Sequence, residues 1–159
     1  MQELWQSMEV QGERGRVRKS RRFVVKRSRN SDSITKGTFD MRPHEKLEVW
    51  KRAIDFVVAV YKMTESFPRD EKFGLISQIR RAAVSVPANI AEGAGRHTSK
   101  EFKYFLSNAQ GSVSELATEL LIAHKLGYLK KETFEIGNRE LTSIGRMILG
   151  LSRSVSRDS

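Results

Sequence analysis

The stretch of the chain that most constrains its fold is residues 77–96, which read SQIRRAAVSVPANIAEGAGR. At the helical step of about 100° per residue, its polar side chains fall in one narrow stripe. This stripe, called the polar seam below, contains Gln78, Arg81, Ser85, Asn89 and Glu92. The opposite face is broad and apolar, and a smaller third sector is also apolar and contains Phe73, Val84, Pro87 and Ala91. A helix that is apolar nearly all round is usually buried on more than one side, so we expect this helix to be central or to face another subunit, with the third sector as the oligomer interface.

Apolar residues recur at helical spacing in three further segments. Together with the central helix, predicted over 72–92, they predict helices over residues 45–66, 99–126 and about 131–155. In the last of these, Phe134, Leu141, Ile148 and Val155 repeat every seven residues, a spacing typical of bundle packing. Four helices of similar length with short connections predict an all-α, up-down-up-down antiparallel four-helix bundle.

The composition excludes several classes of site. The chain has no cysteine, and its three histidines, His44, His97 and His124, lie far apart in sequence, so neither a disulfide nor a metal site is expected. We expect no cofactor either. No apolar run approaches the roughly 20 residues that span a bilayer, so we expect no membrane association and a cytoplasmic location.

The charge is unevenly distributed along the chain. The 159 residues carry a formal net charge of +10, and nine basic and no acidic residues lie between Arg14 and Arg29. Residues 1–40 are therefore predicted to be a disordered basic arm. The arm could bind phosphates. Alternatively, it is a solvated tail or an over-long gene start, in which case Met41 is the alternative initiator. Residues 41–155 form the predicted bundle and 156–159 a polar tail. The basic excess favours an anionic partner such as nucleic acid.

The polar seam and the proline beside it allow two kinds of interpretation. Pro87 removes a backbone hydrogen bond to the carbonyl of Ala83 and is expected to kink the helix, where Ser85 and Asn89 could satisfy the freed groups. The seam then serves as a buried network that sets the helix register. Ligand contact is the alternative. Catalysis is disfavoured, because Glu92 has no histidine or second carboxylate nearby in the pattern.

The turn over residues 93–100, with the sequence GAGRHTSK, is the best candidate for a phosphate contact in the folded domain. Its glycines feed a helix whose first N–H groups are available to an anion, and Thr98 and Glu101 have capping-box spacing. The alternative is an ordinary helix-turn-helix corner, since the Walker spacing is absent. The predicted nucleic-acid contacts are Arg80, Arg96, Lys100 and Lys103.

Three segments of the chain resemble a known family. They are residues 44–50 (HEKLEVW), 78–93 (QIRRAAVSVPANIAEG) and the helix over 102–119. They look like the four-helix bundle proteins encoded in intervening sequences of bacterial 23S ribosomal RNA genes, to which the accessory variability protein of diversity-generating retroelements is related. The resemblance covers about residues 44–155. It implies a homopentameric barrel that binds nucleic acid and has no established enzymatic activity. Lys130 departs from the pattern, because Ser, Thr or Asp would cap the last helix better.

These observations lead to one main hypothesis and two alternatives. The main hypothesis is a non-enzymatic, oligomeric bundle that binds RNA or DNA through phosphates. The first alternative is a structural or adaptor oligomer that binds a protein such as a reverse transcriptase. The second, an RNase of the small-bundle type with an Arg-x(4–6)-His motif, is disfavoured because no arginine lies five to seven residues before any histidine.

Overall fold

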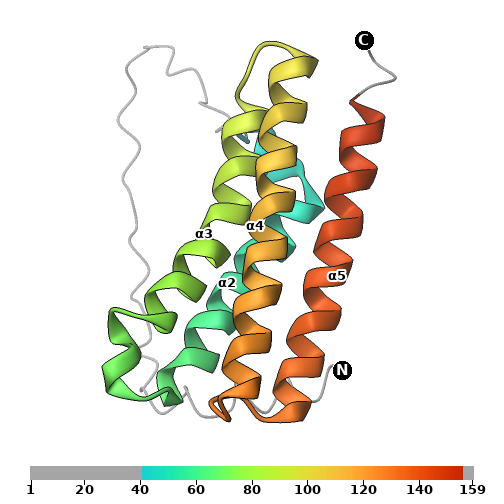
Figure 1. Cartoon of the computed structure of the whole chain (residues 1–159). Helices are drawn as coiled ribbons and strands as arrows, with labels where there is room; N and C mark the ends of the chain where they lie inside the picture. The colour runs from blue at the N-terminus through green and yellow to red at the C-terminus, as the bar shows by residue number, and fades with distance from the viewer. Residues whose placement is uncertain (1–40, 156–159) are drawn as a thin grey trace, which may run out of the picture. The chain divides into compact units, whose positions relative to one another are not determined.

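The computed structural model describes residues 41–155, and all of its long elements are helices. The helices are α2 (Glu48–Met63), α3 (Leu75–Ala94), α4 (Ser99–Lys125) and α5 (Lys131–Ser154). Short 3₁₀ turns, η1 (Pro43–Lys46), η2 (Thr64–Ser66) and η3 (Arg69–Lys72), precede and follow α2. The predicted all-α four-helix bundle is confirmed for this part of the chain, as Figure 1 shows. The predictions for residues 1–40 and 156–159 lie outside the described residues.

The helix ends follow local chemistry. The hydroxyl of Thr98 accepts a hydrogen bond from the N–H of Glu101, which caps α4 as its spacing predicts. Gly127 follows the end of α4 with φ of 79°, a left-handed conformation that glycine adopts without a side-chain clash. The start of α3 was predicted too early. Residues 72–74 form the end of η3 and a turn, so Phe73 lies before the helix and not on its third apolar sector.

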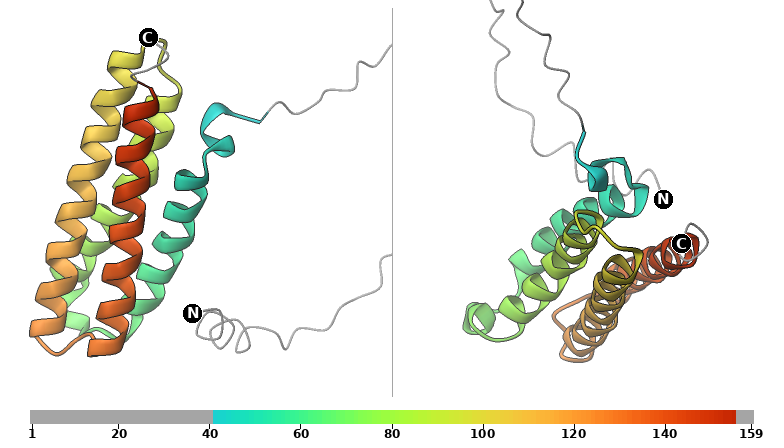
Figure 2. Two further views of the ribbon diagram at one scale, coloured as in Figure 1. Left: turned by 90° about the vertical axis from the view of Figure 1, so that its right-hand side faces the viewer. Right: turned by 90° about the horizontal axis from the view of Figure 1, so that it is seen from above.

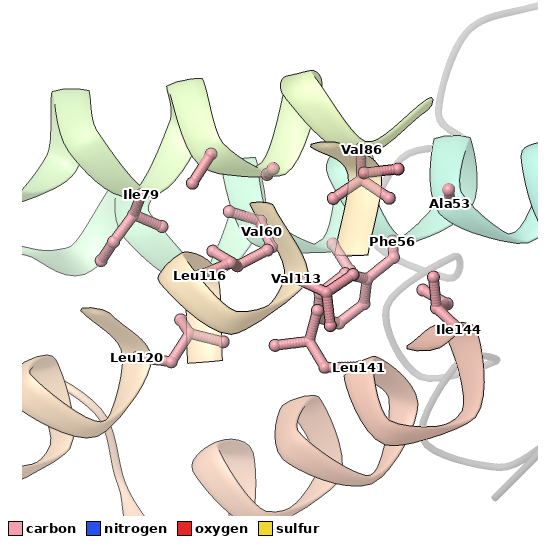
Figure 3. Close-up of a cluster of buried hydrophobic side chains, with 14 of the residues drawn as sticks. Ala53, Phe56, Val60, Ile79, Val86, Val113, Leu116, Leu120, Leu141 and Ile144 are labelled. Carbon is pink, nitrogen blue, oxygen red and sulfur yellow. The ribbon is translucent and has the colours of Figure 1, made fainter. Parts of the chain in front are cut away.

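The four helices pack as antiparallel neighbours in chain order, with α3 against α4 as the most extensive pair and α2 against α5 as a weaker one. Figures 1 and 2 show α4 and α5 side by side along their length. The core contains residues from all four helices, and Figure 3 shows part of it. Labelled there are Ala53, Phe56, Val60, Ile79, Val86, Val113, Leu116, Leu120, Leu141 and Ile144.

Two residues of α3 show why this helix is central. Gly93 is buried, and a Cβ atom built on it would lie 2.7 Å from Cδ2 of Phe102 and 2.8 Å from Cβ of Phe105. It therefore lets α3 and α4 approach closely. The helix ends within the segment 93–95, with Ala94 as its last residue and Gly95 as its C-cap. Pro87 is also buried, and α3 is continuous through it.

An ion pair joins the weakly packed helices α2 and α5. The guanidinium of Arg52 donates two hydrogen bonds to the carboxylate of Glu140, through Nε to Oε1 and through a terminal nitrogen to Oε2 at 2.9 Å. These hydrogen bonds raise the pKa of Arg52 above its ordinary value. The paired geometry resists sliding of one helix along the other, because both bonds must be kept at once.

Candidate nucleic-acid interface

The corner between α3 and α4 lies next to a small hollow at the end of the bundle. The hollow has a volume of about 260 Å³ and is lined by residues 96–99, Phe102 and Val155. It therefore lies where the α3–α4 turn meets the end of α5. Ser99, the first residue of α4, lines the hollow, and the N–H groups of a helix's first turn favour an anion.

The charges at this corner are mixed. Arg96 forms an ion pair with Glu92 one helical turn earlier, and its guanidinium lies 4.8 Å from the ring centre of Phe105. Glu101 carries a carboxylate in the first turn of α4, and the pKa of Glu101 lies below its ordinary value because the Thr98 hydroxyl donates to it at 2.6 Å. An incoming phosphate at the corner thus meets a paired arginine and a stable negative charge.

Lys100 and Lys103 are less engaged than Arg96. Lys100 is exposed and Lys103 is half-buried, and neither side chain forms a hydrogen bond or ion pair with the described residues. Both belong to the first two turns of α4. Of the four residues predicted to contact nucleic acid, these two are the ones whose charge is not used inside the bundle.

Arg80 makes contacts within the protein. Its Nε atom donates to Oγ1 of Thr64 at 2.8 Å, and a terminal nitrogen donates to the carbonyl of Tyr61 at 3.4 Å. Its guanidinium also lies 4.5 Å from the centre of the Tyr61 ring. Thr64 is only 1% exposed. Arg80 thus joins α3 to the end of α2. Lys100 and Lys103 belong to a different helix, α4.

The polar seam is less buried than predicted. Gln78, Arg81 and Glu92 are exposed, whereas Ser85 and Asn89 are half-buried. Helical residues whose side chains lie at the edge of a contact keep one side in water, and this explains the difference. Gln78 accepts a hydrogen bond from Arg81, and the Glu92 carboxylate pairs with Arg96, so the seam consists of short local pairs at its two ends.

The middle of the seam does connect two helices. The hydroxyl of Ser112 in α4 donates to the hydroxyl of Ser85 at 2.9 Å, and the amide of Asn89 donates to the carbonyl and hydroxyl of Ser85 at 2.8 and 3.0 Å. The amide therefore bonds to the carbonyl of Ser85 and not to that of Ala83, the group that Pro87 deprives of a donor. The prediction that Asn89 satisfies the carbonyl freed by Pro87 is thus wrong. The hydrogen bond between Ser85 and Ser112 does connect α3 to α4.

Glu119 of α4 belongs to the same α3–α4 contact and was missed by the sequence reasoning. It is 9% exposed, and its Oε2 atom has no hydrogen-bond partner. Burial and the nearby charge of Glu115 raise the pKa of Glu119 to about 7, which the charge of Arg81 only partly opposes. A count of α4 at helical spacing would have placed Glu119 seven residues after Ser112, on the same face.

The predicted oligomer interface is split by the structure. Phe73 and Val84 are 89% and 43% exposed, Ala91 is half-buried, and Pro87 is buried within the chain itself. The neighbouring helix α2 also exposes apolar residues, which are spaced by about one helical turn. The exposed α2 residues are Ile54, Val58 and Tyr61. This α2–α3 face, with Val84, is one apolar surface that is left uncovered within residues 41–155, where Leu121, Ile122, Leu126 and Leu149 are also exposed.

Neither a metal-ion cluster nor a membrane-spanning helix occurs in the described part of the chain. Within residues 41–155, no three His, Asp or Glu side chains are grouped so that they could hold a metal ion. None of the described helices combines the length and the apolarity that crossing a membrane requires.

Comparison with known proteins places the chain in a family. Residues 45–150 match the family described as 23S rRNA-intervening sequence protein. A solved structure of a protein of unknown function from the S23 ribosomal protein family, from Bacteroides thetaiotaomicron VPI-5482, is similar in fold, with a TM-score of 0.62 and 23% identity over 66% of this chain and 95% of that chain. A search of curated proteins found no match. The chain belongs to the 23S rRNA-intervening sequence protein family.

Proposed function

We propose that this protein is a non-enzymatic, oligomeric helical bundle that binds nucleic acid through phosphate contacts. The observation that carries the proposal is the pair of cations at the start of α4, Lys100 and Lys103, whose charge is not neutralised within the described bundle. The formal net charge of +10 supports it, because a basic protein attracts polyanions at long range.

The direct test is binding of the full chain to structured RNA and to duplex DNA at several salt concentrations. If the protein neutralises phosphates, the logarithm of the binding constant falls linearly with the logarithm of salt concentration, because condensed counterions are released. A flat dependence, or no binding at low salt, contradicts the proposal. Sequencing of nucleic acid that copurifies with the protein would identify the natural partner.

The absence of enzymatic activity has its own test. Purified protein is incubated with labelled RNA, with and without a divalent metal, and the RNA is followed by gel electrophoresis. Intact RNA in both conditions agrees with the proposal. Cleavage activity that copurifies with the protein, and that is lost when a substitution in the protein abolishes it, would support the RNase alternative.

The assembly proposal rests on the uncovered apolar α2–α3 face. Ile54, Val58, Tyr61 and Val84 are each between 38% and 51% exposed, and contiguous exposed apolar surface often marks an interface between proteins. The family resemblance implies a homopentamer. Light scattering coupled to size-exclusion chromatography measures the mass directly. Val58→Glu is expected to shift an oligomer toward the monomer, and a wild-type monomer contradicts the proposal.

The same face favours one alternative function. An adaptor that binds a protein partner, such as a reverse transcriptase, would use an apolar surface in place of a cationic one. Neighbouring genes distinguish the two functions at little cost. A reverse transcriptase gene with a repeat pair supports the adaptor, and an insertion in an rRNA gene supports the ribosomal context.

A further inference from the structure

Three arginines of α5 recur at the same position of successive heptads. Arg139, Arg146 and Arg153 are each seven residues apart and all are exposed. Each arginine comes five residues after an apolar heptad residue of α5, namely Phe134, Leu141 or Ile148. Five residues turn a side chain by about 140° around the helix axis. The packing that directs the apolar heptad into the core therefore directs the arginines outward. We call these three residues the arginine ladder.

The side chains of the arginine ladder are unpaired. None of the three forms a hydrogen bond, ion pair or ring contact with any residue of the described 41–155 segment. By contrast, Arg52, Arg80, Arg81 and Arg96 all donate to side chains of the protein. The ladder thus combines three full charges that are exposed to solvent and available to an external anion.

The surroundings of the ladder strengthen its positive field. From Leu141 to Val155, α5 has no acidic residue, and from Phe102 to Ser114, α4 has none. These two segments are neighbours, because the position of a Cβ atom on Gly145 lies 3.2 Å from Gln110 and 3.6 Å from Val113. Lys103 is the cation of this α4 segment. Arg146 and Arg153 lie within this acid-free part of α5, whereas Arg139 lies before it, four residues after Glu135. No carboxylate of the two segments opposes Arg146 or Arg153, in contrast to the α3–α4 corner with Glu92 and Glu101.

A stripe of small exposed residues runs along α4, the neighbour of α5 in the bundle. Four exposed residues of α4 at helical spacing, Ser107, Gly111, Ser114 and Thr118, are small. A side chain at Gly111 would meet nothing within 4 Å, so the fold itself does not require glycine there. Short side chains let a partner's backbone come close to the helix, and their hydroxyl groups can donate to phosphate oxygens.

We propose that the arginine ladder, with Lys103 beside its end, is a binding surface for double-stranded nucleic acid. This inference rests on the proposed function and specifies its surface and its ligand class. Successive arginines are about 10.5 Å apart along a rigid helix. This regular spacing lets neighbouring arginines contact separate phosphates of a rigid duplex. Residues 135–155, the part of the chain that carries the ladder, contain no aromatic side chain on which unpaired bases could stack, which favours a duplex over a single strand.

The test compares two triple variants of the full chain that lose the same charge. The first variant is Arg139→Gln, Arg146→Gln and Arg153→Gln. The control is Lys62→Gln, Arg69→Gln and Lys130→Gln, which removes three exposed cations from positions outside α4 and the arginine ladder. Fluorescence anisotropy measures binding to a 20-base-pair RNA duplex, a DNA duplex of the same sequence and one single strand, from 50 to 200 mM salt.

The ladder variant is expected to bind both duplexes about tenfold or more weakly than the wild type, and its salt slope should fall by about 2 to 3, since each lost phosphate contact removes about 0.9. The control should change affinity less than about threefold. A third variant with three Arg→Lys changes should keep most of the slope, because it keeps the charges. Circular dichroism of each variant verifies folding, and if the triple glutamine variant is unfolded, Arg146→Gln alone should lower the slope by about 1.

The outcomes separate this inference from the function on which it rests. If wild-type protein binds no nucleic acid, the proposed function fails and the ladder fails with it. If wild-type binding is salt-dependent but the ladder variant and the control lose affinity equally, the function stands and the ladder is wrong. Equal affinity for the single strand and the duplexes contradicts the duplex preference. A loss confined to one duplex assigns the ladder to RNA or to DNA.

Discussion

The Nε atom of Arg80 lies 2.8 Å from Oγ1 of the buried Thr64, 16 residues earlier in the chain. The same hydroxyl donates to the carbonyl of Val60 or of Tyr61, each at 3.0 Å. Arg80 therefore extends the hydrogen-bonded end of α2 onto α3 and covers the ring of Tyr61. A guanidinium that is used in this way adds to stability and has fewer donors available for a phosphate.

We expect Arg80→Lys to lower the free energy of unfolding by about 1 to 2 kcal/mol, because an ammonium cannot make both hydrogen bonds and the ring contact. Urea unfolding monitored by circular dichroism measures the change. Nucleic-acid affinity should stay within about threefold of the wild type, since the charge is kept. If Arg80→Gln instead preserves stability and lowers the salt slope of binding by about 1, Arg80 is a phosphate contact as the sequence predicted.

Gly93→Ala should destabilise the bundle by about 1 to 3 kcal/mol, because the new methyl group overlaps Phe102 and Phe105 and the helices must separate. Gly111→Ala is the matched control in α4, where the added methyl group meets nothing within 4 Å. It should stabilise the protein by up to about 1 kcal/mol, since alanine favours the helix. Thermal unfolding of both variants checks the pair, and equal melting temperatures would contradict the close-packing role of Gly93.

Glu119 makes stability depend on pH. Its pKa is raised in the folded protein, to about 7, so the folded state binds the proton more tightly than the unfolded state. The contribution of Glu119 to stability is therefore most favourable below pH 4.5, falls as pH rises toward 7 and levels off above it. At pH 8 the ionised Glu119 costs on the order of 3 kcal/mol.

Glu119→Gln should remove that cost. We expect it to raise the free energy of unfolding at pH 8 and to change it little at pH 4.5, because a protonated carboxyl and an amide are both neutral. Urea titrations at the two pH values measure the difference. Glu115→Gln, an exposed change on the same helix, is the control and should have a smaller effect at pH 8. A gain from Glu119→Gln that is equal at both pH values would contradict the assignment.

Lys130 is the N-cap residue of α5 and its side chain accepts no hydrogen bond from the helix. Its backbone already has the extended conformation typical of a cap, with φ of −63° and ψ of 150°. Lys130→Asp should therefore stabilise the protein by about 0.5 to 1.5 kcal/mol through a new cap and the helix dipole. Lys130→Ala removes the charge without adding a cap, and a melting temperature as high as that of the aspartate variant would rule out the capping explanation.

The local features of this chain follow from its sequence because they depend on side-chain periods and on neighbours within one or two turns. The apolar heptad of α5, the cap at Thr98, the left-handed Gly127 and the four-helix bundle itself were all predictable in this way. The seven-residue spacing of Arg139, Arg146 and Arg153 is likewise visible in the sequence.

Only the tertiary structure decided which polar groups are used inside the bundle. Arg52 and Glu140 are 88 residues apart, and Ser85 and Ser112 are 27 apart, so no local pattern pairs them. Burial of Pro87, the unpartnered carboxylate of Glu119 and the contact of Gly93 with two phenylalanines likewise depend on how closely α3 meets its neighbours. A helix period determines the direction of a side chain around its own axis, and the packing of another helix determines what that side chain meets.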